Sequence, residues 1–158
     1  MRLLEAAKIP YDLLEYEVDE NDLSGMHIAE QLGFPPEKMF KTLVAKGDKT
    51  GPLVFCIPVA EEIDLRRAAS ITGNKKIEMI HVKDLLALTG YIRGGCSPVG
   101  MKKKFPTYFH ASAAHLDKIT VRRDLSVAIR EVYEILFMNI NLADKLAEIT
   151  DHNVIIYV

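Results

Sequence analysis

Several features that mark particular protein classes are scarce or missing in this 158-residue sequence. Two cysteines, Cys56 and Cys96, are too few for a disulfide framework and lack the paired spacing of a zinc site, so we expect a reducing compartment. No apolar run approaches the roughly 20 residues of a membrane span, and the first ten residues lack the basic and apolar regions of a signal peptide. These absences predict a cytoplasmic protein that does not contact a membrane.

An excess of charge of one sign is missing as well. The chain has 20 Lys and Arg residues against 22 Asp and Glu residues, which gives a net charge of −2. This balance provides no attraction of the whole protein for nucleic acid, so any contact with nucleic acid must be local. The five histidines show no metal-ligand spacing with Cys, Asp or Glu, and we therefore expect no metal.

What the sequence does contain is a globular balance, with 49% apolar and 27% charged residues. No repeat, low-complexity tract or linker divides it, which predicts a single domain over residues 1–158. Strands are expected at residues 11–18, 39–46, 52–59, 76–80, 107–112, 118–121 and 153–158. Helices are expected at residues 2–8, 27–33, 64–73, 82–90 and 142–149, with Ser24 and Asp64 as N-caps. Residues 132–140 fit either a strand or a buried helix. Because strands and short helices do not alternate regularly, we expect an α+β domain with a mixed sheet.

The strand expected at residues 39–46 has a lysine in its middle. Side chains alternate along a strand, so Lys41 shares a face with Met39, Leu43 and Ala45, and the opposite face is also largely apolar. At a sheet edge, the alkyl stem of Lys41 would cover apolar surface while its ammonium reached water, and composition favours this interpretation. An enclosed ammonium would instead need an anion beside it or a lowered pKa, and either would mark a site.

Residues 91–106, "YIRGGCSPVGMKKKFP", have no periodicity and are expected to form a loop. Gly94 and Gly95 permit backbone paths closed to other residues, and Pro98 stiffens the turn. A loop of this kind can direct backbone N–H groups at a carbonyl or phosphate oxygen, as an oxyanion hole does, or it can be an ordinary long turn. The glycine spacing is not that of a Walker or dinucleotide loop, and we expect no cofactor.

Basic residues near this loop are candidates for contacts with phosphate groups. Lys102, Lys103 and Lys104 lie at its C-terminal end, and Arg66 and Arg67 form a second basic pair. The alternative is that these residues are only solvated charges.

Five segments carry a family resemblance when they are taken in order. They are "YEVD" at 16–19, "FKTLV" at 40–44, "PVAEEIDLRRAA" at 58–69, "KKIEM" at 75–79 and "TGYIRGGCSPVGMKKKFP" at 89–106. Together they resemble the YbaK/EbsC family of free-standing aminoacyl-tRNA deacylases, which are similar to the editing domain of bacterial prolyl-tRNA synthetases. The likeness runs from about residue 2 to about residue 121 and is closest to the Cys-tRNA(Pro) deacylase branch.

The resemblance implies a mixed, barrel-like β-sheet surrounded by short helices. It also implies site residues at the positions that match the family's motifs. These are Lys41, Gly94 and Gly95 as catalytic residues, and Tyr16, Thr42, Cys96, Ser97 and Pro98 as substrate-binding residues. Contacts with the tRNA are expected at Arg66, Lys102, Lys103 and Lys104.

Members of this family release a wrongly attached amino acid from the 3′-terminal adenosine of a tRNA. A synthetase gains only about 1 to 3 kcal/mol of discrimination per methylene, so a second site must remove its errors. The resemblance therefore implies an enzyme that acts on mischarged tRNA(Pro), with Cys-tRNA(Pro) as substrate, an extension to Cys-tRNA(Cys), and a complex with prolyl-tRNA synthetase. Release would follow attack on the ester by water or by the substrate's own thiol, which would form a thiolactone. Lys41 would position the terminal adenosine while the glycine loop holds the carbonyl.

The sequence departs from the family pattern after residue 121. Family members continue with a glycine-rich segment, whereas this chain has no glycine between residues 101 and 158. The difference leaves two alternatives open, namely a non-catalytic module of the same fold that binds tRNA or a synthetase, and a deacylase for Ala-tRNA(Pro). The apolar residues 135–140 and 154–158 need pairing partners, so a monomer and a homodimer both remain open.

Overall fold

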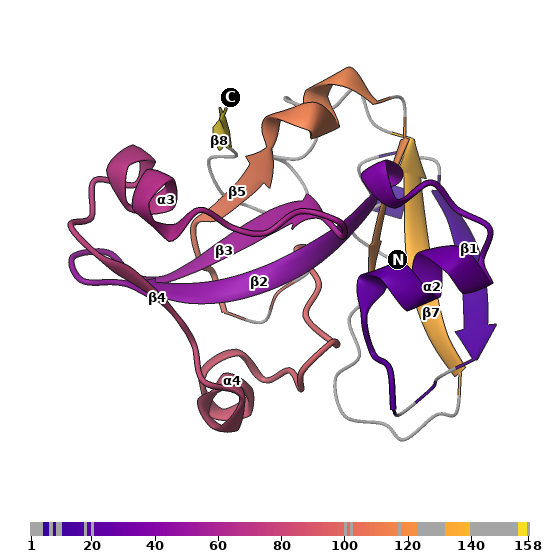
Figure 1. The fold of residues 1–158 in the computed structure, drawn as a ribbon, viewed down its shortest axis with the longest axis horizontal. Helices are drawn as coiled ribbons and strands as arrows, with labels where there is room; N and C mark the ends of the chain where they lie inside the picture. The colour runs from indigo at the N-terminus through magenta and orange to yellow at the C-terminus, as the bar shows by residue number, and fades with distance from the viewer. Residues whose placement is uncertain are drawn as a thin grey trace.

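The computed structural model describes residues 5–6, 8, 11–17, 19, 21–99, 101, 103–116, 118–122, 132–139 and 155–157. These residues form one mixed sheet of eight strands with short helices around it (Figure 1). The strands are β1 (Tyr11–Glu17), β2 (Met39–Gly47), β3 (Gly51–Pro58), β4 (Ile77–Met79), β5 (Thr107–His110), β6 (Lys118–Arg122), β7 (Val132–Asn139) and β8 (Ile155–Tyr157). The helices are α2 (Gly25–Gln31), α3 (Leu65–Ile71), α4 (Val82–Thr89) and the 3-10 helices η1 (Pro36–Lys38) and η2 (Ala111–His115).

The strands follow the order β1-β7-β6-β2-β3-β5-β8, and β4 pairs with β2 off this path. The pairs β2–β6, β3–β5 and β5–β8 are parallel and the others are antiparallel. The sheet is strongly twisted. In Figure 1, β2 and β3 run almost at right angles to β1 and β7. The structure therefore confirms the expected α+β class, with a mixed sheet and short helices.

Local signals in the sequence explain where the helices begin and end. The Ser24 hydroxyl accepts a hydrogen bond from the backbone N–H of His27 at the start of α2, and Asp64 caps α3 by accepting from two backbone N–H groups. Gly90 ends α4 in the left-handed conformation, with φ 83°. Both predicted N-caps are confirmed. Among the described residues, no helix is long and apolar enough to cross a bilayer.

Two predictions near the C-terminal half are settled by the structure, and others lie outside the described residues. Residues 132–139 form the strand β7, which decides between the strand and the buried helix. The strand predicted to end at residue 112 ends at His110 instead, because the His110 ring accepts a hydrogen bond from the Ser112 backbone N–H and caps η2. The helix predicted at 142–149 and most of the helix at 2–8 lie outside the described residues.

The apolar core lies on both faces of β2. On one face, Met39 packs with Tyr16 and Ile28, and Ala45 packs with residues of β3 and α3. On the other face, Val44 packs with residues of α4 and of the loop that follows it. In Figure 1, α3 and α4 accordingly lie on opposite sides of β2.

The edge of β2 that faces away from β3 is the feature of the fold that positions the site. Along the edge that faces β3, the two strands pair over the whole length of β2. Along the opposite edge, β2 pairs with β6 only at Met39 and Phe40, and with β4 only at residues 45–47. In the described part of the chain, residues 41–43 therefore have no strand beside them on this edge.

Candidate functional site

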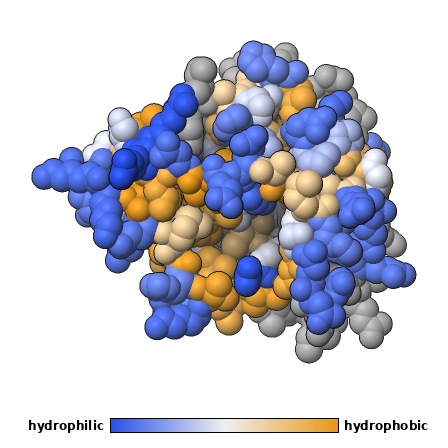
Figure 2. All heavy atoms as spheres, in the orientation of Figure 1, coloured by the Kyte–Doolittle hydropathy of each residue, from blue (hydrophilic) through white to orange (hydrophobic). Residues whose placement is uncertain are grey.

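A cavity of about 370 Å³ lies at this gap between β6 and β4. This volume falls within the range of small-molecule sites, roughly 300 to 1,000 Å³. The walls come from the start of α2, from residues 39–44 of β2, from β6, from the segment joining β4 to α4, and from the loop after α4. Figure 2 shows a hollow with largely apolar walls on this face of the molecule.

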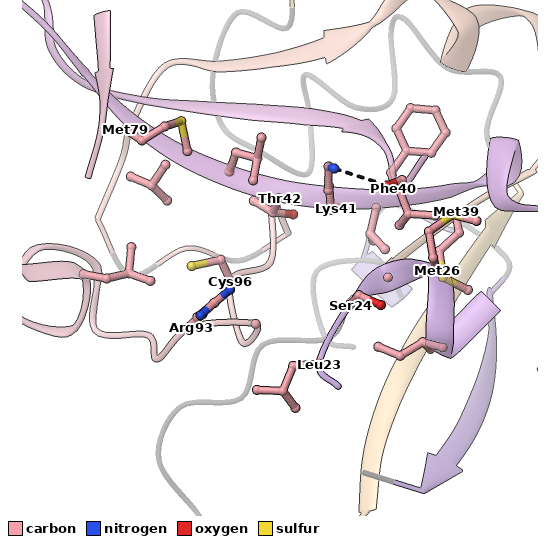
Figure 3. Close-up of a pocket in the computed structure, with 18 of the residues that line it drawn as sticks. Leu23, Ser24, Met26, Met39, Phe40, Lys41, Thr42, Met79, Arg93 and Cys96 are labelled. Carbon is pink, nitrogen blue, oxygen red and sulfur yellow. Dashed lines mark hydrogen bonds between the residues drawn. The ribbon is translucent and has the colours of Figure 1, made fainter. Parts of the chain in front are cut away.

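Lys41 is the central charged residue of this cavity (Figure 3). Its side chain is half-buried, and its Nζ donates a hydrogen bond to the backbone carbonyl of Val59 at 3.1 Å. Among the described residues, no carboxylate forms an ion pair with this ammonium, and no Asp or Glu lines the cavity. A lysine ammonium has three N–H donors, so after the bond to Val59 it can offer two to a bound anion or oxygen atom.

Thr42 contributes backbone groups to the same cavity. In an antiparallel pair, the backbone groups of successive residues point to opposite edges. The Met39 carbonyl accepts from the Val59 N–H on the β3 side, and the Val44 carbonyl accepts from the Ile80 N–H on the other side. The N–H and C=O of Thr42 therefore point to the open edge, where a ligand can meet both a donor and an acceptor.

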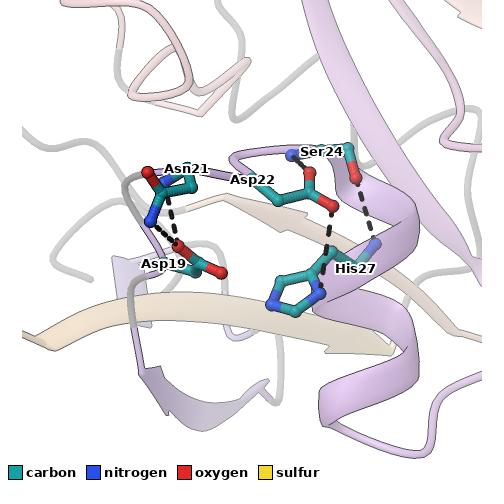
Figure 4. A network of polar contacts seen from close by, with 5 residues as sticks. All are labelled: Asp19, Asn21, Asp22, Ser24 and His27. Atoms are coloured by element: carbon teal, nitrogen blue, oxygen red, sulfur yellow. Dashed lines mark hydrogen bonds and ion pairs between the residues drawn. The ribbon is translucent and has the colours of Figure 1, made fainter.

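A capped loop fixes the wall that leads into α2 (Figure 4). Asp19 accepts hydrogen bonds from the backbone and side chain of Asn21, and Asp22 accepts from the backbone N–H of Ser24 at 2.9 Å. The hydrogen bonds of Ser24, together with nearby His27, keep the pKa of the exposed Asp22 below its ordinary value. These bonds hold the turn that places Leu23 and Ser24 in the cavity wall.

The glycine loop supplies the wall on the opposite side of β2 from Lys41. Gly94 and Cys96 line the cavity, and Gly94 has φ 79°, a conformation that residues with a side chain rarely adopt. The Gly95 N–H donates to the Ile92 carbonyl at 3.0 Å, so an oxyanion hole here would have to use other amides of the loop. Lys41 and the loop reach one cavity because the edge of β2 between them is open.

The remaining predicted residues that the structure describes lie outside this lining. Ser97 and Pro98 are buried in the same loop, where the Ser97 hydroxyl accepts from the Val99 N–H. Tyr16 is buried in the adjoining core cluster beside Met39. Arg66 is on α3, while Lys103 and Lys104 are exposed and Lys103 donates to a carbonyl of α4. Lys102 lies outside the described residues.

Among the lining residues that were not selected from the sequence, Arg93 and Thr120 could contribute to the chemistry of the site. Arg93 is exposed beside Gly94 and brings a second cation to the cavity, and its position next to the glycine pair was the signal that could have identified it. Thr120 is fully buried on β6. It gave no signal, because a threonine between apolar residues is ordinary in a strand.

The two thiols are both buried, and they differ in their place relative to the cavity. Cys96 lines it, whereas Cys56 on β3 belongs to the core cluster around Phe40, with its sulfur 3.9 Å from the Thr42 hydroxyl oxygen. Burial raises the pKa of Cys56 to about 12, so this thiol stays protonated and unreactive at neutral pH. Within the described part of the chain, no three His, Cys, Asp or Glu residues are grouped to hold a metal ion.

Comparison with known proteins shows which sequences are similar to this chain. Residues 26–123 match the family of the aminoacyl-tRNA editing domain, a range that includes Lys41, the glycine loop and Thr120. A protein of Enterococcus faecalis (strain ATCC 700802 / V583), named "Putative Cys-tRNA(Pro)/Cys-tRNA(Cys) deacylase EbsC", is 52% identical over 121 residues, which cover 77% of this chain and 74% of that protein.

Two solved structures have a fold similar to that of this chain. A crystal structure described as a "putative trans-editing enzyme for prolyl tRNA synthetase" has a TM-score of 0.68 at 19% identity, over 98% of this chain and 91% of that one. The hypothetical protein APE2540 has a TM-score of 0.74 at 20% identity, over 97% and 94% of the two chains. At these identities the likeness concerns the fold alone, whereas the family match covers well over half of the sequence. The chain therefore belongs to the aminoacyl-tRNA editing domain family.

Proposed function

We propose that this protein is a trans-editing deacylase that removes cysteine from Cys-tRNA(Pro). The observation that carries the proposal is the Lys41 ammonium, which lines a cavity without carboxylates and has no ion-pair partner among the described residues. Such a site suits an anionic or oxygen-rich ligand, such as the terminal phosphate and ribose of a tRNA. The relative that is 52% identical bears the name of a Cys-tRNA(Pro)/Cys-tRNA(Cys) deacylase, so Cys-tRNA(Cys) is a second proposed substrate.

The chemistry asks little of the protein as a nucleophile, because an aminoacyl ester is already reactive. In the thiol route, the substrate's sulfur forms a bond to its own ester carbonyl carbon and the bond from that carbon to the ribose oxygen breaks. The thiol proton ends on the ribose oxygen, and a cyclic thiolactone leaves. In the hydrolytic route, water supplies the oxygen and free cysteine leaves. In either route the carbonyl oxygen gains negative charge, which N–H donors at the site would stabilise.

Three polar residues of the cavity take a role in the proposed reaction. Lys41 positions the tRNA end through a hydrogen bond from its Nζ to a phosphate or ribose oxygen. The Thr42 N–H and C=O offer one donor and one acceptor to the ribose hydroxyls or the ester. Arg93 lies at the exposed rim, where it can contact the phosphate backbone of the same strand.

We also propose where the reaction takes place and which partners the protein meets. We place the reaction in the cytoplasm, where a tRNA charged in error can be corrected before it is used in translation. The exposed cations Arg66, Lys103 and Lys104 remain predicted contacts for the body of the tRNA, together with Lys102. Delivery of the tRNA by prolyl-tRNA synthetase would reduce the need for an excess of positive charge, and the net charge of this chain is −2.

A substrate panel tests the proposal against its alternatives. Purified protein is incubated with Cys-, Ala- and Pro-charged tRNA(Pro), and loss of the aminoacyl group is followed over time. We expect rapid loss of cysteine and retention of proline. Loss of alanine alone would identify a deacylase for Ala-tRNA(Pro), and no loss from any of the three would identify a binding module.

The same assay distinguishes the two routes of release. Ser-charged tRNA(Pro) carries a hydroxyl in place of the thiol, and this hydroxyl is the poorer nucleophile. The thiol route predicts that serine is released much more slowly than cysteine. Equal rates would instead favour attack by water.

A further inference from the structure

The hydroxyl of Thr120 is an exception among the buried threonines. Thr89 and Thr107 are also buried, and their hydroxyls donate to backbone carbonyls at 2.7 Å and 3.0 Å. The Thr120 hydroxyl is buried as completely and has no hydrogen-bond partner in the part of the chain that the structure describes. A buried hydroxyl without a partner costs stability, so its retention calls for a ligand that satisfies it.

The position of Thr120 places that ligand in the cavity already described. Its neighbours along β6, Ile119 and Val121, belong to the core cluster around Phe40, so Thr120 faces the opposite side of the sheet. It is paired in register with Met39, and Lys41 lies two residues further along the same face of β2. Thr120 and Lys41 therefore belong to one wall, and both line the cavity.

The surroundings limit what the hydroxyl can bind. No carboxylate among the described residues lines the cavity, and Lys41 and Arg93 already supply two positive charges. A positively charged side chain on the amino acid would be disfavoured there, whereas a neutral thiol or hydroxyl can both donate to and accept from Thr120. The rest of the lining is mostly Leu, Met, Val and Ile, which suits the methylene that carries such a group.

We propose that Thr120 is a specificity-determining residue, whose hydroxyl forms a hydrogen bond with the thiol or hydroxyl on the β-carbon of the amino acid carried by the tRNA. This inference rests on the proposed deacylase function. A site with a polar group of this kind disfavours the analogue that lacks its partner, because the group then stays buried and unpaired. Cysteine and serine should thus be preferred over alanine through Thr120.

The test compares Thr120→Val, Thr120→Ser and wild type on Cys-, Ser- and Ala-charged tRNA(Pro). Valine has nearly the same shape as threonine and lacks the hydroxyl, whereas serine keeps it. We expect Thr120→Val to lower kcat/KM for Cys and Ser about tenfold, with Ala unchanged, and Thr120→Ser to keep the wild-type preference. Each variant is compared with wild type on the same substrate, so differences in intrinsic reactivity between the three esters cancel.

The outcomes separate this inference from the function on which it rests. Turnover by all proteins with an unchanged Cys-to-Ala ratio would overturn the role of Thr120 alone, and so would an equal fall on all three substrates. No turnover by wild type on any substrate would overturn both the function and the inference.

Thermal unfolding without tRNA gives a second and independent measurement. Thr107→Val is the matched control, because Thr107 is a buried threonine on β5 whose hydroxyl is paired. We expect Thr120→Val to raise the Tm by about 2 to 4 °C and Thr107→Val to lower it. If Thr120→Val lowered the Tm as the control does, the hydroxyl would have a partner inside the protein and the inference would be wrong.

Discussion

Among the individual residues, Lys41 answers the question raised by a cation in an apolar strand. The sequence left two alternatives, an ammonium in water or an enclosed one. The structure shows an intermediate state in which the half-buried ammonium donates to the Val59 carbonyl and lines a cavity. A backbone carbonyl compensates only part of the desolvation of a charge, so the site is completed most favourably by an anionic or oxygen-rich ligand.

Cys56 supports a prediction about stability at alkaline pH. Its pKa is about 12 in the folded protein because the thiol is buried, against 9.0 for an exposed thiol. Below pH 9 the Cys56 thiol is protonated in both the folded and the unfolded protein, so its burial contributes fully to the free energy of unfolding. Above pH 9 the thiol ionises first in the unfolded chain, and this contribution is lost as the pH rises toward the pKa of the folded protein.

Urea denaturation of wild type and Cys56→Ala at pH 8 and pH 10 measures this loss. The stability difference between the two proteins should narrow by about 1.4 kcal/mol at the higher pH, since one unit above the unfolded pKa corresponds to that amount. Because both proteins share all other titrating groups, the comparison isolates the thiol. A difference that stays constant would show that Cys56 ionises equally in both states.

Among the elements, α2 is linked to β2 through Val59, the residue that follows β3. A Cβ added to Gly25 would meet the Val59 side chain, with only 2.7 Å to its Cβ. The carbonyl of the same Val59 accepts the hydrogen bond from Lys41. The close approach of α2 therefore fixes the acceptor that positions the lysine.

Gly25→Ala should reduce kcat/KM for Cys-tRNA(Pro) by about tenfold or more, because either α2 or Val59 must shift. Gly47→Ala is the control, since its added Cβ would lie 2.6 Å from the Asn74 side-chain nitrogen in a contact away from the cavity. Both variants should unfold at lower temperature, and at a temperature where both are folded only Gly25→Ala should be impaired. Equal activity of the two variants would separate α2 from the function of Lys41.

The same elements show what can be predicted locally. Alternating apolar residues, the caps at Ser24 and Asp64 and the glycine after α4 predict elements that the structure contains, because these signals act over a few residues. Residues 132–139 could not be assigned in this way. Their strand state is set by pairing with β6 on one side and on the other with β1, which lies near the opposite end of the chain.

For the whole molecule, the site is harder to predict than the fold. Lys41 and the glycine loop could be selected from the sequence through the family resemblance. The cavity could not, because it exists where β6 and β4 pair with opposite ends of one edge of β2 and leave its middle open. Thr120 and Arg93 become candidates only when this arrangement is known.

The match to the editing family ends at residue 123, close to the point where the sequence leaves the family pattern. Lys41, the glycine loop, α2 and Thr120 all precede that point. We therefore place the chemistry of the proposed activity in residues 26–123.

Deacylation of Cys-tRNA(Pro) by Lys41→Ala, compared with wild type and Lys46→Ala, tests the central claim most directly. Lys46 is an exposed lysine on the same strand, so its loss controls for the removal of one positive charge. We predict that Lys41→Ala lowers kcat/KM about ten- to hundredfold, the range expected for a lost hydrogen bond to a charged group, while Lys46→Ala stays close to wild type. Full activity of Lys41→Ala would contradict the account.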